Sequence, residues 1–129
     1  MFKNFIEWIH TKMRLDGRVR KINSIKEGEV YWCALGENIG DEENGKGNLF
    51  RRPVLVFKKF NNNIFWGISM STKNKGNIYY VKVLLKDIEQ SAIISQLRIL
   101  DSKRLDLYIG YISKDSFVKI QSSVKNLIQ

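Results

Sequence analysis

After residue 28, short runs of β-branched and aromatic residues alternate with clusters of turn residues, and this pattern constrains the fold more than any other feature. A period of two places alternate side chains on opposite faces, so each run predicts a strand. Asn61–Asn63 and Asn74–Asn77 have the composition of turns. Strands are expected at 30–35, 54–59, 64–71, 78–85 and 92–100. Five or more short strands joined by tight turns predict a mainly β fold, a small closed or half-open barrel.

Both ends of the chain are expected to be helical. Residues 2–14 place Phe2, Phe5, Ile6, Ile9 and Met13 at helical spacing, which predicts an amphipathic helix that packs through Phe5, Ile6 and Ile9. Near the other end, Ser113 is a good N-cap for a helix with an apolar stripe over 117–127. We therefore expect residues 1–26 to form a helix and connector, and residues 27–129 to form the barrel domain.

A glycine-rich and acidic segment at 36–50 separates the first two predicted strands. It has no apolar periodicity, which indicates a long loop, and loops of this length in compact domains are usually functional or disordered. Pro53, the only proline, is expected to open the strand that follows, a position where no ladder donor is needed.

The charge of the chain favours a polyanionic partner. Lys and Arg number 22 against 13 Asp and Glu, and the formal net charge is +9. Such an excess is typical of nucleic-acid-binding proteins, although it also serves simply to keep a small protein soluble. A single cysteine, Cys33, excludes an intramolecular disulfide. No apolar run approaches the length of a membrane span, and the N-terminus lacks a signal-peptide cleavage site, so we expect a cytoplasmic protein without membrane contact.

Four segments, in order and with similar spacing, resemble the PemK/MazF family of toxins from type II toxin–antitoxin systems. They are Glu27–Tyr31 (EGEVY), Gly40–Glu42 with Arg52–Val56 (GDE and RPVLV), Ile68–Thr72 (ISMST) and Ser95–Leu105 (SQLRILDSKRL). Each match alone is weak, but four in the family's order are improbable by chance. The predicted loop is longer than in short members of the family, and helix 2–14 is an addition to the minimal barrel.

The resemblance implies both a fold and an activity. The fold would be an SH3-like barrel of five to seven strands, with the N-terminal helix added and a C-terminal helix. The activity would be that of a sequence-specific endoribonuclease that cleaves single-stranded RNA without metal or other cofactor. The family also implies a homodimer and a cognate antitoxin protein whose C-terminal segment lies in the RNA groove.

Metal-free RNA cleavage by the 2′-hydroxyl requires a base, an acid and fixed positive charge around the phosphate. The only histidine, His10, lies outside the matched segments, which leaves arginine, carboxylate and hydroxyl groups. The resemblance implies that Arg52 is the catalytic arginine, that Ser71 orients the scissile phosphate, and that Glu42 is the general base. From the residues alone, a surface arginine is the favoured interpretation of Arg52. A turn serine is nearly as good an interpretation of Ser71, and a solubilising acid competes for Glu42.

Candidate RNA-binding residues surround these three positions. Alternation within the strand would place Ser71 on one face with Ser69 and would make Thr72 a weaker candidate than Ser71. Gln96 and Arg98 would share a strand face, either on the RNA or at a dimer interface. The full set of expected RNA contacts is Arg51, Lys58, Thr72, Lys73, Gln96 and Arg98.

Two alternatives stay open. Gyrase-poisoning toxins share the barrel class and act by clasping a protein, through their C-terminal residues. The end of this chain, 126–129, has the composition of an ordinary helix terminus, which disfavours that alternative. A plain RNA-binding barrel without catalysis is the other, and substitution of Arg52 would separate it from an enzyme.

Overall fold

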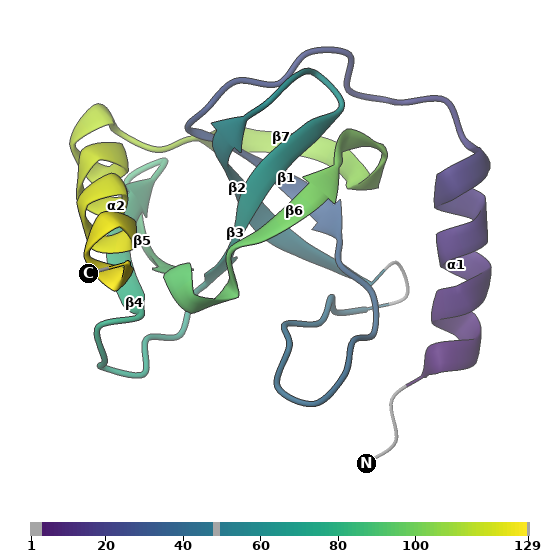
Figure 1. Ribbon diagram of the computed structural model, residues 1–129, viewed down its shortest axis with the longest axis horizontal. Helices are drawn as coiled ribbons and strands as arrows, with labels where there is room; N and C mark the ends of the chain where they lie inside the picture. Colours follow the sequence, from purple (N-terminus) through teal and green to yellow (C-terminus); the bar gives the residue numbers. More distant parts are fainter. Residues whose placement is uncertain (1–3, 48–49, 129) are drawn as a thin grey trace.

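The computed structural model of the protein describes residues 4–47 and 50–128 (Figure 1). Two helices flank a set of seven strands within this part of the chain. In order, the elements are α1 (Phe5–Gly17), β1 (Glu29–Ala34), β2 (Arg51–Lys59), β3 (Ile64–Ser71), β4 (Tyr80–Leu85), β5 (Ile88–Ile93), the 3₁₀ helix η1 (Ile94–Gln96), β6 (Arg98–Asp101), the 3₁₀ helix η2 (Ser102–Arg104), β7 (Leu105–Tyr111) and α2 (Lys114–Leu127).

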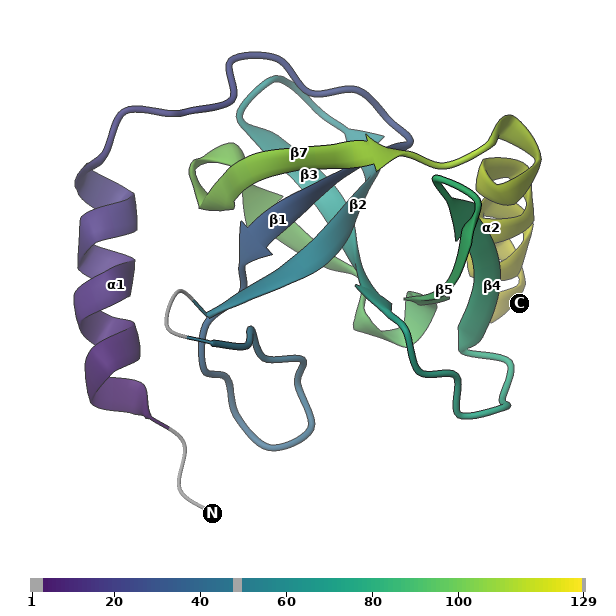
Figure 2. The same ribbon diagram turned by 180° about the vertical axis from the view of Figure 1, so that it is seen from behind.

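The strands form one antiparallel sheet in the order β4-β5-β3-β2-β1-β7, with β6 paired to β3. The sheet is strongly curved, and the helices stand on opposite sides of it (Figures 1 and 2). A mainly β fold with a helix at each end is therefore confirmed. Neither described helix is long and apolar enough to cross a membrane.

Local chemistry explains most of the element boundaries. Asn4 accepts a hydrogen bond from the Glu7 amide and begins α1, and Ser113 accepts one from the Ser116 amide and begins α2, as predicted. Asn61 Oδ1 accepts bonds from the amides of Asn63 and Ile64, which closes the predicted hairpin between β2 and β3.

Most buried apolar side chains belong to two clusters on the two faces of the curved sheet. One lies under α2 and includes Leu55, Ile68, Met70 and Ile120. The other lies under the connector that follows α1 and is built from β1, β2, β3, β6, the first residue of β7 and Ile25. These clusters fix the central strands, and with them the position of the side chains at the ends of β2 and β3.

Helix α1 packs on the barrel through a different face from the one predicted. Phe5, Ile6, Ile9 and Met13 are all exposed, and Phe2 lies outside the described residues. Trp8 is buried instead, in a third apolar cluster that adds Ala34, Phe50 and Leu15. Its indole fits the space over Gly36, where a Cβ atom would lie 2.0 Å from Trp8 Cε2. Because Gly36 has no side chain, there is space for the Trp8 indole, and α1 packs through the face that carries Trp8.

Three strand predictions need correction. Strand β2 begins at Arg51, so Pro53 lies inside it, where it is paired with Trp32. The run at 92–100 is broken by η1, because Ile94–Gln96 turns the chain from β5 to β6. The alternating segment at 105–111 forms β7, which the sequence interpretation missed.

Candidate functional site

An open cleft of about 540 Å³ lies where β2 begins and β3 ends. Its walls come from β1, β2, β3, β5 and β7, together with the loop between β1 and β2. The polar side chains that line it are Arg51, Arg52, Ser71, Thr72, Lys73, Lys46 and Gln90. Five of the nine residues predicted to act on RNA therefore share this cleft.

Arg52 is held at the base of the cleft by the loop that precedes β2. Its Nη1 lies 3.0 Å from Glu43 Oε2, and its Nε donates to the Asn44 carbonyl at 3.1 Å. The side chain is 12% exposed, so it is largely buried yet reaches the cleft surface. A guanidinium carries five donors, and these two contacts leave others for a phosphate.

Ser71 ends β3 on the other side of the cleft. The register that pairs Val54 with Ser69 would place Ser71 opposite Arg52 if it continued by two residues. Ser71 Oγ accepts a bond from the Lys73 amide at 3.1 Å, so its O–H proton is free to point at a ligand. The predicted alternation fails here: Ser69 is buried, while Met70, Ser71, Thr72 and Lys73 all line the cleft as the strand turns away.

The structure brings Glu43, not Glu42, to Arg52. Glu42 is exposed and its carboxylate accepts a bond from the Ile39 amide at 3.0 Å, within its own turn. The Glu43 amide donates to Gln96 Oε1 at 3.2 Å, and Gln96 Nε2 donates to the Asp41 carbonyl at 3.3 Å. Gln96 therefore secures the loop from η1 and does not line the cleft.

Arg51 forms the outer wall of the cleft. Its guanidinium lies 5.5 Å from the ring centroid of Trp32, and its Nη1 contacts Asp106 Oδ2 at 2.9 Å. The hydrogen bond from Lys21, and the positive charges of Lys21 and Arg51, lower the pKa of Asp106 from its ordinary value. Asp106 therefore stays ionised and fixes Arg51 at the rim.

Lys58 and Arg98 lie away from the cleft. Lys58 is exposed six residues along β2 from Arg52, about 20 Å at the rise of a strand. Arg98 is paired with Gly67 on β6, and its charge acts on Cys33 and Arg104. Neither lines the cleft that holds Arg52 and Ser71, and their contact with RNA stays a prediction.

Two residues at the site were not among the predicted set: Glu43, which contacts Arg52, and Trp32, which lines the cleft. Glu43 is one residue from the predicted acid, and the choice depends on a loop closed by the tight approach of Gly45 to Phe50. Trp32 alternates with buried neighbours on β1 and was assigned to structure, yet it faces the cleft. Trp32 occupies the outward-facing position of β1, and that position is the signal that could have identified it as a site residue.

The described residues contain no group of three His, Cys, Asp or Glu side chains placed to hold a metal ion. Metal independence stays a prediction, since the observation concerns the protein's own ligands only.

Comparison with known proteins is consistent with this geometry. Residues 26–128 match the profile of the PemK-like, MazF-like toxins of type II toxin–antitoxin systems. MazF from Deinococcus radiodurans is 17% identical with a TM-score of 0.66, over 81% of this chain and 96% of that chain. An endoribonuclease from a mycobacterial species is 16% identical with a TM-score of 0.61, over 84% and 94%.

A MazE–MazF structure from Deinococcus radiodurans is also similar, at 16% identity and a TM-score of 0.59, over 81% of this chain and 95% of that chain. At such identities the likeness to solved structures shows the fold alone. No curated protein sequence matches the chain.

Proposed function

Because the chain belongs to the family of PemK-like, MazF-like toxins of type II toxin–antitoxin systems, we propose that it is an endoribonuclease that cuts single-stranded RNA in the cleft around Arg52. The observation that carries the proposal is an open cleft in which a guanidinium and a hydroxyl meet, with a carboxylate paired to the guanidinium. Arg52 contacts Glu43 at 3.0 Å, and both Arg52 and Ser71 line the cleft.

The chemistry proceeds by attack of the 2′-hydroxyl oxygen on the adjacent phosphorus. A new O–P bond forms, the bond from phosphorus to the 5′-oxygen breaks, and the products are a 2′,3′-cyclic phosphate and a 5′-hydroxyl. The 2′-hydroxyl proton passes to a carboxylate, and the leaving oxygen takes a proton from solvent. Glu43 is our choice for the carboxylate, because Glu42 bonds within its own turn.

Arg52 stabilises the charge that builds on the phosphate oxygens. Its planar fork matches two such oxygens, and its mostly buried position strengthens the interaction relative to water. Ser71 donates its O–H to the same phosphate and so fixes its orientation. Arg51, Thr72 and Lys73 hold the flanking backbone, and Trp32 offers a partly exposed ring for a stacked base.

The partners follow from the family and from charge. A cognate antitoxin with an acidic segment would complement the +9 surface and exclude RNA by lying in the cleft. The proposal includes a homodimer acting in the cytoplasm, with residues 27–129 as the family barrel and residues 1–26 as an addition to it.

The test is cleavage of a long single-stranded RNA by the purified protein in EDTA, with the ends of the products sequenced. We expect 2′,3′-cyclic phosphate and 5′-hydroxyl ends. Arg52→Ala should reduce the rate by about 10²–10³-fold, the usual cost of one preorganised donor. Lys125→Ala, on the exposed face of α2, is the control for loss of one positive charge.

Two results would contradict the proposal. One is wild-type cleavage by a folded Arg52→Ala variant, which would place the chemistry elsewhere. The other is RNA that stays intact while it remains bound, which would indicate the binding module without catalysis. Cleavage lost in EDTA and restored by Mg²⁺ would refute metal independence alone.

A further inference from the structure

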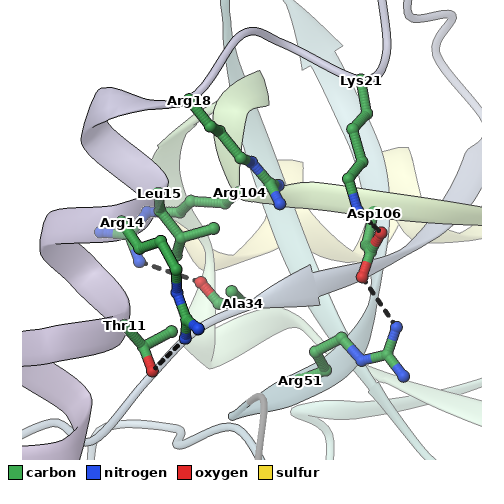
Figure 3. Close-up of a pocket in the computed structure, with 9 residues that line it drawn as sticks. All are labelled: Thr11, Arg14, Leu15, Arg18, Lys21, Ala34, Arg51, Arg104 and Asp106. Carbon is green, nitrogen blue, oxygen red and sulfur yellow. Dashed lines mark hydrogen bonds and ion pairs between the residues drawn. The ribbon is translucent and has the colours of Figure 1, made fainter.

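A second pocket, of about 180 Å³, lies between α1 and the barrel (Figure 3). That volume is several times the ~30 Å³ that one water occupies in the liquid, which is enough for a phosphate group. Its charged lining consists of Arg14, Arg18, Lys21, Arg51 and Arg104, with Asp106 as the single acid. Figure 3 shows these side chains reaching the pocket from α1, the connector and the sheet.

The pocket holds more positive charge than its own carboxylate can neutralise. Asp106 contacts both Lys21, at 2.8 Å, and Arg51, at 2.9 Å. Within residues 4–47 and 50–128, Arg14, Arg18 and Arg104 form no ion pair and bond only to neutral oxygens. Three guanidinium groups therefore share this pocket with one acid that is already engaged.

Arg104 is held between the barrel and α1 by two contacts. It donates to the Ala34 carbonyl at 3.0 Å and lies 5.9 Å from the ring centroid of Trp8. Burial, and the like charge of Arg98, lower the pKa of Arg104 from its ordinary value. Holding partly buried cations together without an anion is unfavourable, and a bound anion would relieve that cost.

The pocket is adjacent to the candidate RNA cleft, because Arg51 lines both. A strand that leaves the cleft past Arg51 meets the cluster of arginines next. We propose that this pocket binds a backbone phosphate of the RNA, at a nucleotide outside the scissile step. The inference rests on the proposed function, since it extends the path of the same substrate.

The pocket is lined by residues of the N-terminal segment 1–26 as well as by residues of the barrel. Arg14, Arg18 and Lys21 precede residue 26, where the match to the family begins. Helix α1 therefore acquires a role: it lengthens the RNA-binding surface beyond the shared cleft, and Arg14 is its exposed contact.

Arg14→Gln tests the pocket, because Arg14 is exposed and its side chain bonds only to Thr11, at 3.2 Å, among the described residues. The probe is a fluorescent 2′-O-methyl RNA of about twelve nucleotides, within the usual site size for single strands and resistant to 2′-hydroxyl attack. Anisotropy gives Kd at several salt concentrations. We expect Kd to rise about tenfold and the salt slope to fall by about 0.7, the value for one lost phosphate contact.

Two further variants complete the design. Arg14→Lys keeps the charge and should restore most of the salt slope while recovering only part of the affinity. Lys125→Gln makes the same change in net charge on α2, which stands on the other side of the sheet from α1. It should leave the salt slope close to that of the wild type. Thermal melts of all three variants check that α1 remains folded.

The outcomes separate this inference from the proposed function. Wild-type affinity and slope in Arg14→Gln, with binding weakened in Arg52→Ala, would overturn the pocket and leave the nuclease intact. An effect of Arg14→Gln on binding by a protein that cleaves no RNA would support the pocket while the proposed activity fails. Inorganic phosphate that shifts the NMR signals of Arg14 and Arg104, with RNA binding unaffected by Arg14→Gln, would overturn the assignment to RNA.

Discussion

Arg52 is held in the cleft by two contacts that both come from the loop before β2. One partner is a backbone carbonyl, which no substitution removes, and the other is the Glu43 carboxylate. A substrate phosphate would approach the same guanidinium, so Glu43 and the phosphate share its donors. Glu43 therefore positions the arginine, and its second role, as the base, is part of the proposal.

Glu43→Gln and Glu42→Gln form a matched pair of adjacent substitutions. Loss of the Glu43 carboxylate removes the ion pair and the proposed base, so we expect cleavage to slow by about 10²-fold or more. Glu42 is exposed and bonds only within its turn, so its change should stay within about twofold. Single-turnover cleavage rates measure both. Equal loss in the two variants would contradict the assignment to Glu43.

Cys33 should be unreactive in the folded protein. It is fully buried, and burial raises the pKa of its thiol to about 12, so the nucleophilic thiolate is essentially absent at pH 8. We expect iodoacetamide to label Cys33 only after unfolding in urea, as read by mass spectrometry. Because the folded pKa is raised, this group also stabilises the fold below its unfolded pKa and loses that contribution as the pH rises above it. Rapid labelling of the native protein would show that β1 opens.

At the scale of the element, α1 packs on the barrel because the large side chain of Trp8 lies over Gly36, which has no side chain. The Trp8 indole lies over Gly36, and its ring centroid is 5.5 Å from that of Phe50. Gly36 and Phe50 belong to the base of the loop that carries Glu43. The added helix therefore contacts the segment that positions Arg52.

Gly36→Ala should detach α1, because its Cβ would lie 2.0 Å from Trp8. Gly76→Ala is the matched control: its φ is +72° against +78° for Gly36, and no atom lies within 4 Å of its Cβ. Both variants carry the strain of a positive φ, and only Gly36→Ala also loses the burial of Trp8. In urea unfolding, we expect Gly36→Ala to lower the free energy of unfolding by about 3 kcal/mol more than Gly76→Ala does. Similar losses, with unchanged Trp8 fluorescence, would contradict this account of the docking.

Elements defined by local patterns were predictable, and elements defined by distant contacts were not. Strand β3 and the cap at Ser113 follow from period and capping chemistry. The buried face of α1 could not be read from its apolar stripe, because the opening over Gly36 exists only in the folded barrel. The break at η1 likewise depends on where β5 and β6 must pair, on two different stretches of β3.

For the whole molecule, two acids join the connector to the barrel: Asp101, which pairs with Arg20, and Asp106. Asp106 pairs with Lys21 and Arg51, and those contacts lower its pKa below the ordinary value near 3.9. A lowered pKa contributes stability that is complete above the unfolded pKa and is lost as the pH falls through the folded one.

Asp106→Asn should lower the free energy of unfolding by about 1 kcal/mol at pH 7 and flatten its decline below about pH 4. Asp16→Asn removes the same charge from an exposed side chain and should leave the acid decline unchanged. Urea unfolding at a series of pH values measures both. An acid decline of the same slope in Asp106→Asn and in the wild type would refute the role of this pair.

At this scale the sequence predicted the class of fold, whereas the residues that line the cleft were predicted only in part. Arg52, Ser71, Arg51, Thr72 and Lys73 do meet in one cleft. Lys58, Gln96 and Arg98 do not line it, because a linear motif does not tell which strand ends converge. The pocket beside α1 was not anticipated, since its cations come from segments far apart in the chain.

The loop between β1 and β2 is closed at its base, and that closure has a consequence for how the chain can vary. The amides of Leu35 and Gly36 both donate to the Phe50 carbonyl, and Gly45 donates to Gly36. Residues 39 and 40 lie between this fastened base and the Asp41 carbonyl that Gln96 holds, so residues inserted or exchanged there need not shift Arg52. New surfaces for the proposed RNA substrate can thus be added without moving the arginine at the centre of the cleft.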